Sequence, residues 1–214
     1  MEQSAKKTLL LHACCGPCSS ACLERLFPEY DITVFYYNPN ITDAAEYALR
    51  EKELAGFLAC WQPEGRDTGI GLLSGRYDPE EYYSCIRGLE QEPEGGERCY
   101  RCYKLRMEET ARTAAEQGFD AFDTTLSISP YKRSRWIEEI GRALAQQYGP
   151  EYLAGNYKKQ DGYRRSIELS KEYGLYRQDY CGCEFSKAEA EQRRAARQTA
   201  QDAQGTQSDK ETRL

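Results

Sequence analysis

The stretch TLLLHACCGPCSS, residues 8–20, determines how this chain begins to fold. An apolar run, Thr8–His12, leads into Cys14-Cys15-Gly16-Pro17-Cys18, and an amphipathic segment, 21–27, follows. A run of this kind before a Gly/Pro turn predicts a buried strand, a tight turn and a helix, with Ser19 or Ser20 near the N-cap of that helix.

The rest of the chain continues this alternation. Strands are predicted at 31–37, at 70–73 and at 121–126, and helices at 42–58, from residue 78, at 100–117, 131–148 and 161–173. Alternating strands and helices predict an α/β domain of three layers with a mainly parallel sheet, spanning residues 1–186. Ligands of such domains bind at the carboxyl ends of the strands. The first cysteine cluster, Asn38–Asn40 and the 127–132 loop are all expected there. Residues 187–214 predict a charged helix that frays into a disordered tail.

The composition limits the classes of function. Forty per cent hydrophobic residues in a chain of 214 exclude wholesale disorder. A formal charge of −6 argues against a protein that coats nucleic acid, although a local basic patch can still bind structured RNA. The apolar run at the N-terminus is too short for a signal peptide, and nothing approaches the roughly 20 apolar residues of a membrane span. We therefore expect a cytoplasmic protein without a membrane partner.

Seven of the ten cysteines fall into three separated clusters: Cys14-Cys15-x-x-Cys18, Cys99-x-x-Cys102 and Cys181-x-Cys183. Cytosolic thiols stay reduced, so this pattern indicates metal binding or redox chemistry rather than disulfides. One tetrahedral zinc uses four thiolates. The cysteines beyond these four favour an iron–sulfur cluster plus a second metal or a dithiol. A structural zinc with spare thiols is the simpler alternative.

Two further hypotheses remain open on the residues alone. Cys15-Gly16-Pro17-Cys18 between a strand and a helix resembles the redox motif of thioredoxins, but that chemistry has no use for the other clusters. A zinc-stabilised RNA-binding module without catalysis is the third class. Cys22, Cys60 and Cys85 lack partner spacing and are interpreted as small apolar residues. His12, the one histidine, is either structural or helps to orient the metal ligands.

Candidate substrate contacts come from two sources. Asn38, Asn40 and Ser129 follow the ends of predicted strands. Basic residues interleaved with tyrosines supply the phosphate contacts and stacking surfaces that RNA loops require, although an ordinary solvated helix face has the same composition. The candidates of this second kind are Tyr131, Lys132, Tyr157, Arg165 and Arg177.

Five ordered motifs together resemble one family, the QueH-type epoxyqueuosine reductases. The motifs run from about Leu9 to Ser186: LLLHACCGPCSS, YYNPNI, GGERCYRCYKLRMEETA, FDAFDTTLSISPYK and YRQDYCGCEFS. The resemblance implies a Rossmann-like fold of the adenine nucleotide α-hydrolase-like (HUP) type. It also implies the last step of queuosine biosynthesis: the epoxide of epoxyqueuosine, in the anticodon loop of certain tRNAs, is reduced to the cyclopentene of queuosine without cobalamin.

The same resemblance implies the cofactors. It suggests a [4Fe–4S] cluster with an additional iron ion, fed by an external electron donor and held by all seven clustered cysteines, without showing which thiolate serves which metal. Cys14, Cys15 and Asp179 are the candidate catalytic residues, Asp179 as one of several groups that could supply a proton. Cys18 is the least secure ligand, because the adjacent Cys14 and Cys15 can already supply the two ligands needed at that end of the site.

Overall fold

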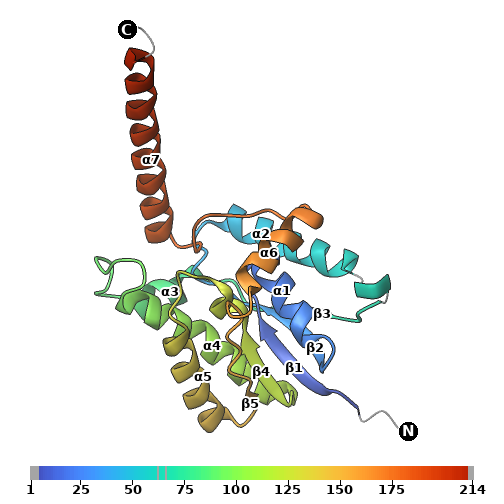
Figure 1. Ribbon diagram of the computed structural model, residues 1–214. Helices are drawn as coiled ribbons and strands as arrows, with labels where there is room; N and C mark the ends of the chain where they lie inside the picture. Colours follow the sequence, from blue (N-terminus) through green and yellow to red (C-terminus); the bar gives the residue numbers. More distant parts are fainter. Residues whose placement is uncertain (1–4, 62, 66, 212–214) are drawn as a thin grey trace.

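Strand β1 lies at the centre of a five-stranded sheet in which every neighbouring pair is parallel (Figure 1). The computed structural model describes residues 5–61, 63–65 and 67–211. The strands are β1 (Lys7–His12), β2 (Tyr30–Tyr36), β3 (Gly71–Ser74), β4 (Ala121–Thr124) and β5 (Glu151–Tyr152). The α-helices are α1 (Gly16–Leu26), α2 (Ala44–Cys60), α3 (Pro79–Ile86), α4 (Glu97–Gln117), α5 (Ser134–Tyr148), α6 (Gly162–Glu172) and α7 (Glu184–Glu211). This confirms the predicted α/β class with a parallel sheet and a Rossmann-like arrangement.

The strand order is β3-β2-β1-β4-β5, so the direction of winding reverses between β1 and β4. His12, the last residue of β1, is level with Phe35 of β2 and with Thr124 of β4. The segments that leave these three strands therefore emerge together at one edge. A doubly wound sheet binds its ligands at such a reversal point, so the topology indicates where the functional site lies.

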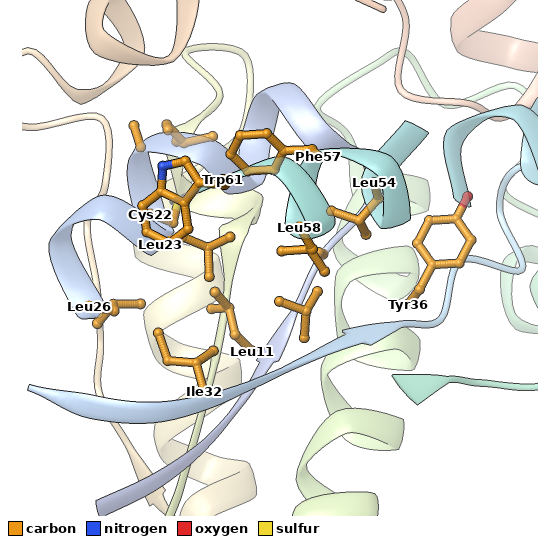
Figure 2. Packing of buried hydrophobic residues seen from close by; sticks show 14 of the residues in the cluster. Leu11, Cys22, Leu23, Leu26, Ile32, Tyr36, Leu54, Phe57, Leu58 and Trp61 are labelled. Atoms are coloured by element: carbon orange, nitrogen blue, oxygen red, sulfur yellow. The ribbon is translucent and has the colours of Figure 1, made fainter. Parts of the chain in front are cut away.

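Alternate residues of the strands pack into two separate cores. Leu9 and Leu11 of β1 face α1 and α2, as Figure 2 shows around Leu11, Leu23 and Phe57. Leu10, between them in sequence, contributes to the opposite core with α4 and α5. Successive side chains of a strand point to opposite faces of the sheet, and both faces are covered by helices. The continuous apolar run Leu9–Leu11 thus reflects burial on both sides.

The start of helix α1 differs from the prediction. The helix begins at Gly16, with Cys15 at the N-cap and Pro17 in the first turn. The prediction of Ser19 or Ser20 as the cap was wrong, because both serines already lie inside the helix. Ser19 Oγ donates to the carbonyl oxygen of Cys15 at 2.7 Å, and Ser20 Oγ donates to that of Pro17 at 3.0 Å. Proline suits the first turn because it needs no hydrogen-bond acceptor there.

Two boundaries after β4 also differ from the prediction. The strand predicted to reach Leu126 ends at Thr124, whose side chain accepts a hydrogen bond from the Leu126 N–H, and a short 3-10 helix, η2, covers Thr125–Ile128. The helix predicted from residue 131 begins only at Ser134. Residues 129–133 are therefore loop, and they lie at the edge where β1 and β4 separate.

The C-terminal segment forms one long helix. Helix α7 begins at Glu184, directly after the last cysteine cluster, and projects away from the sheet and its helices (Figure 1). The charged helix predicted from residue 187 lies within α7, which begins three residues earlier. Fraying into a disordered tail stays a prediction, and residues 212–214 of that tail lie outside the described residues.

Candidate metal centre

The three cysteine clusters are carried by three different parts of the fold. Cys14 and Cys15 occupy the turn from β1 into α1, and Cys18 lies in the first turn of α1. Cys99 and Cys102 lie in the first two turns of α4, and Cys181 and Cys183 lie in the loop before α7. Four of these residues, one or two from each cluster, line a single cavity: Cys14, Cys18, Cys99 and Cys181. The structure thus brings together clusters that lie far apart in the sequence.

The first cluster is already compact enough for a shared metal ion. The Sγ atoms of Cys14, Cys15 and Cys18 all lie within 4.8 Å of one another, and those of Cys14 and Cys15 are 3.9 Å apart. Hydrogen bonds from Cys15 and Cys18 lower the pKa of Cys14 well below its usual range, whereas the bond to Cys14 raises the pKa of Cys15 to about 12. One thiolate is therefore stabilised by its two neighbours. Cys18 belongs to this group, since its sulfur lies within the same 4.8 Å limit.

The second group consists of Cys99, Cys102, Cys181 and Cys183. Burial raises the pKa of Cys102, and the negative charge of the other three thiols raises it further. Cys102 and Cys183 pack in one small apolar cluster with Tyr82 and Ile86. Backbone N–H groups donate to two of the sulfurs: that of Gly95 to Cys99 at 3.2 Å, and that of Ser186 to Cys183 at 3.4 Å. Such bonds stabilise thiolates and metal-bound sulfur.

Buried arginines surround these thiols. Arg50 of α2 is 1 % exposed; its Nε donates to Glu46 at 2.7 Å and its Nη1 to the carbonyl oxygen of Cys181 at 3.1 Å. Arg106 of α4 is fully buried, and the charges of Cys102, Cys181 and Cys14 raise its pKa despite burial. Several of their guanidinium nitrogens have no partner: Arg50 Nη2, Arg106 Nη1 and Arg106 Nη2. Buried cations of this kind require nearby negative charge.

The cavity beside the thiols has a volume of about 340 Å³. Its lining includes residues 128–132 of the β4–α5 connection and residues 177–181 of the loop before α7. Its wall combines thiols with cationic and aromatic groups, chiefly Arg50, Lys132, Arg177, Tyr103 and Tyr163. This volume lies within the range of small-ligand sites. A polar, partly aromatic substituent can therefore reach the thiols from the surface.

Comparison with known proteins agrees with this arrangement. A family model described as Epoxyqueuosine reductase QueH matches residues 9–189. The chain belongs to the QueH family. It is 42 % identical over 185 residues to the epoxyqueuosine reductase QueH of Streptococcus pyogenes serotype M1, covering 86 % of this chain and 72 % of that protein. It is 35 % identical over 191 residues to the QueH of Thermotoga maritima, covering 88 % and 94 %. The family and the enzyme class predicted from the five motifs are confirmed.

Four of the predicted substrate contacts of this QueH chain line the cavity: Ser129, Tyr131, Lys132 and Arg177. Tyr131 is 74 % exposed at its mouth. Lys132 is half-buried, and the charges of Cys181 and Cys14 raise its pKa despite burial. Arg177 Nη1 donates to Ser170 Oγ at 3.0 Å, which fixes the direction of its guanidinium group.

The other four predicted substrate contacts lie elsewhere. Asn38 and Asn40 are buried, and the Nδ2 of Asn38 donates to the carbonyl oxygen of Ala13 at 2.9 Å. Tyr157 is buried and donates to a carboxylate oxygen of Asp123 at 2.5 Å. Arg165 forms two hydrogen bonds to the carboxylate of Glu24, at 2.7 and 2.9 Å. Asn38, Tyr157 and Arg165 thus hold neighbouring segments in place. Neither polar side-chain atom of Asn40 has a hydrogen-bond partner among the described residues. None of the four side chains lines the cavity.

Two other predicted residues have defined surroundings in this QueH chain. Asp179 lines the cavity, and both of its carboxylate oxygens lie 3.2 Å from Nη1 of Arg194 on α7. His12 is fully buried: its Nδ1 is 2.9 Å from Thr124 Oγ1 and its Nε2 is 3.1 Å from the carbonyl oxygen of Tyr37. Burial lowers the pKa of His12 to about 4. Both ring nitrogens are thus used within the sheet edge, so the structural interpretation of His12 applies.

Sequence reasoning missed the buried arginines of this QueH site. Arg106 follows Cys99 and Cys102 by seven and four residues on one helix, and this spacing could have indicated that it shares their face. Arg50 carries no comparable signal, because its place beside Cys181 depends on how α2 packs. Cys22 is buried and Cys60 is exposed outside the centre. Among the described residues, no helix is long and apolar enough to cross a membrane.

Proposed function

We propose that this chain reduces the epoxide of epoxyqueuosine in tRNA to the alkene of queuosine, in the cytoplasm, with electrons from an external donor. The observation that carries the proposal is the cavity of about 340 Å³ in which all three cysteine clusters meet beneath a basic and aromatic rim. Proteins of the same family, at up to 42 % identity in the comparisons above, are named for this activity.

The reaction removes the epoxide oxygen as water. Both C–O bonds break, a C=C bond forms, and the oxygen takes up two protons, so the substrate consumes two electrons and two protons. Thiol and tyrosine side chains alone provide no reservoir of low-potential electrons for this step. The protein therefore requires a redox centre beside the cavity, in direct reach of the bound substituent.

The donor set fits an iron–sulfur cluster with an adjacent iron ion. Seven thiols from the three clusters would hold the two metal groups, because soft thiolate ligands suit iron–sulfur clusters. Fully buried Arg106, which has unpartnered nitrogens, indicates that the negative charge of thiolates is present in the working protein. When bound, the metals supply electrons one at a time and polarise the departing oxygen.

The residues at the rim are suited to bind the substrate. Exposed Tyr131 offers a flat surface on which a base of the anticodon loop can stack, a contact that tolerates many sequences. Arg177 and Lys132 present cations to phosphate or ribose oxygens. Lys132 is also close enough to the thiols to interact electrostatically with Cys14 and Cys18. Its ammonium group can stabilise negative charge as it develops on the epoxide oxygen.

Proton delivery is assigned to groups that already line the cavity. Asp179 is held by Arg194 at the rim, in contact with solvent. A carboxylate in this place can pass protons from water towards the substrate once the substrate displaces the arginine. Replacement of Asp179 by Asn should then slow the reaction more than it weakens tRNA binding, and equal effects on both would count against this role.

A dithiol oxidoreductase is the alternative that the geometry favours less. The thioredoxin mechanism needs Cys15 and Cys18 as an isolated pair, but Cys14 lies within 4.8 Å of both sulfurs. The two proposals predict different mutants. A dithiol enzyme should survive Cys99→Ala and Cys181→Ala, whereas a metal centre that uses all three clusters should lose activity in both.

The decisive test is nucleoside analysis of tRNA from a strain that lacks the gene. Accumulated epoxyqueuosine, restored to queuosine by the intact gene and by Cys60→Ser but not by Cys181→Ser, would support the proposal. Cys60 is a matched control because it is an exposed cysteine outside the three clusters. Unchanged queuosine in the deletion strain would refute the proposed reaction.

A further inference from the structure

Three arginines of the described core are almost fully buried: Arg50, Arg98 and Arg106. Two of them are neutralised by a carboxylate. Arg50 pairs with Glu46 at 2.7 Å, and Arg98 Nη2 lies 3.4 Å from Glu189. Arg98 also donates to the carbonyl oxygens of Glu90 and Glu92. The third, Arg106, differs from both in having no carboxylate partner among the described residues.

The hydrogen bonding of Arg106 is correspondingly incomplete. Its Nε donates to the carbonyl oxygen of Cys102, one helical turn earlier, at 3.3 Å. Its guanidinium carbon lies 5.9 Å from the centre of the Tyr103 ring. Nη1 and Nη2 have no partner. An arginine cannot lose its proton at ordinary pH, and an uncompensated buried charge costs several kcal/mol. The compensating charge must therefore come from neighbouring groups.

The groups whose charge acts most strongly on Arg106 are thiols. Cys102, Cys181 and Cys14 are the residues whose negative charge most favours the guanidinium ion, in that order. Each belongs to a different cysteine cluster. Arg106 does not line the cavity, so a substrate phosphate cannot reach it from that side. Arg106 therefore interacts with cysteines of all three clusters and does not contact the tRNA.

We propose that Arg106 is the internal counter-ion of the metal centre and raises its reduction potential, acting as a positioning residue that does not touch the substrate. This inference rests on the proposed function, because it requires a redox metal centre held by these cysteines. A reduced centre carries one more negative charge than the oxidised one. A fixed cation in a low-dielectric interior therefore stabilises the reduced form more than the oxidised form.

The test uses the full-length protein, reconstituted anaerobically with iron and sulfide, and a redox titration followed by visible absorption and electron paramagnetic resonance. Arg106→Gln keeps a polar side chain but removes the charge, and Arg106→Lys keeps the charge. Arg101→Gln is the matched control, because Arg101 lies on the same helix, is exposed and pairs with Glu97 at 3.2 Å.

We expect Arg106→Gln to lower the ratio of reduced to oxidised centre at least tenfold at a given potential, a shift of about 59 mV for a one-electron couple. Arg106→Lys and Arg101→Gln should stay within about threefold of the unaltered protein, since each leaves a cation beside the centre. Unchanged potential and iron content in Arg106→Gln would overturn the inference. If Arg106→Gln binds no iron, Arg106→Lys decides: normal loading supports the counter-ion role, and equal loss of iron overturns it.

Failure of the proposed function gives a different result. If the unaltered protein binds iron and shows the potential shift but does not convert epoxyqueuosine, only the proposed reaction is refuted. If it binds no iron at all, both proposals are refuted together.

Discussion

Replacement of Gly182 by alanine should damage the centre through the backbone alone. Gly182 separates Cys181 from Cys183, and its φ of 123° is one that residues with a Cβ rarely adopt. A Cβ at this position would lie 2.7 Å from Cγ1 of Ile41, which is fully buried. Backbone strain of about 1–3 kcal/mol and overpacking of about 1–3 kcal/mol together predict a loss of about 2–6 kcal/mol in unfolding free energy.

Urea unfolding of the metal-free protein measures this loss, and iron content after reconstitution shows whether the two cysteines still bind. Gly174→Ala is the matched control. Its φ of 62° is also positive, but no heavy atom lies within 4 Å of the added Cβ, so we expect only a backbone cost of about 1–2 kcal/mol. Equal losses in the two variants, with normal iron content in Gly182→Ala, would refute the packing argument at Ile41.

Three further outcomes are expected. Burial raises the pKa of Asp123 from 3.8 to about 7, so the folded protein favours the protonated carboxyl group. This contribution to the free energy of unfolding, up to about 4 kcal/mol, is complete below pH 3.8 and is lost as the pH rises from there through 7. Asp123→Asn should remove this pH dependence from urea unfolding, and parallel curves would contradict it. Cys181→Ser should lower iron content while Cys60→Ser should not, as measured by metal analysis. Tyr131→Ala should weaken tRNA binding by about 1–3 kcal/mol in a filter-binding assay; unchanged affinity would exclude stacking there.

Much of the fold follows from local sequence. The apolar run before the first cysteine cluster indicated a buried strand, and Asp78-Pro79 indicated the start of α3, where Asp78 accepts a hydrogen bond from the Glu80 N–H. The cap of α1 was misjudged, because Cys15 takes that place without a side-chain hydrogen bond. Serine is common at caps, but Pro17, whose φ angle is fixed near the helical value, lies in the first turn, and the helix starts earlier.

The meeting of the three cysteine clusters was predictable, and the groups around them were less so. The spacing of the cysteines indicated a shared centre, because each cluster can be recognised from the few residues that separate its own cysteines. Arg165 and Tyr157 looked like RNA contacts by composition, yet long-range packing directs them to Glu24 and Asp123. Composition shows that a residue is basic or aromatic. It does not show which carboxylate the fold will place beside it.

The most direct test of the account is a single-turnover reaction. The protein is loaded anaerobically with iron and sulfide and mixed with an equal amount of tRNA that carries epoxyqueuosine, with a chemical reductant kept in excess so that two electrons reach each epoxide. We predict queuosine in an amount comparable to the loaded protein, and none with zinc-loaded protein of the same concentration. A fully iron-loaded, reduced protein that binds the tRNA and leaves its epoxide intact would contradict the central claim.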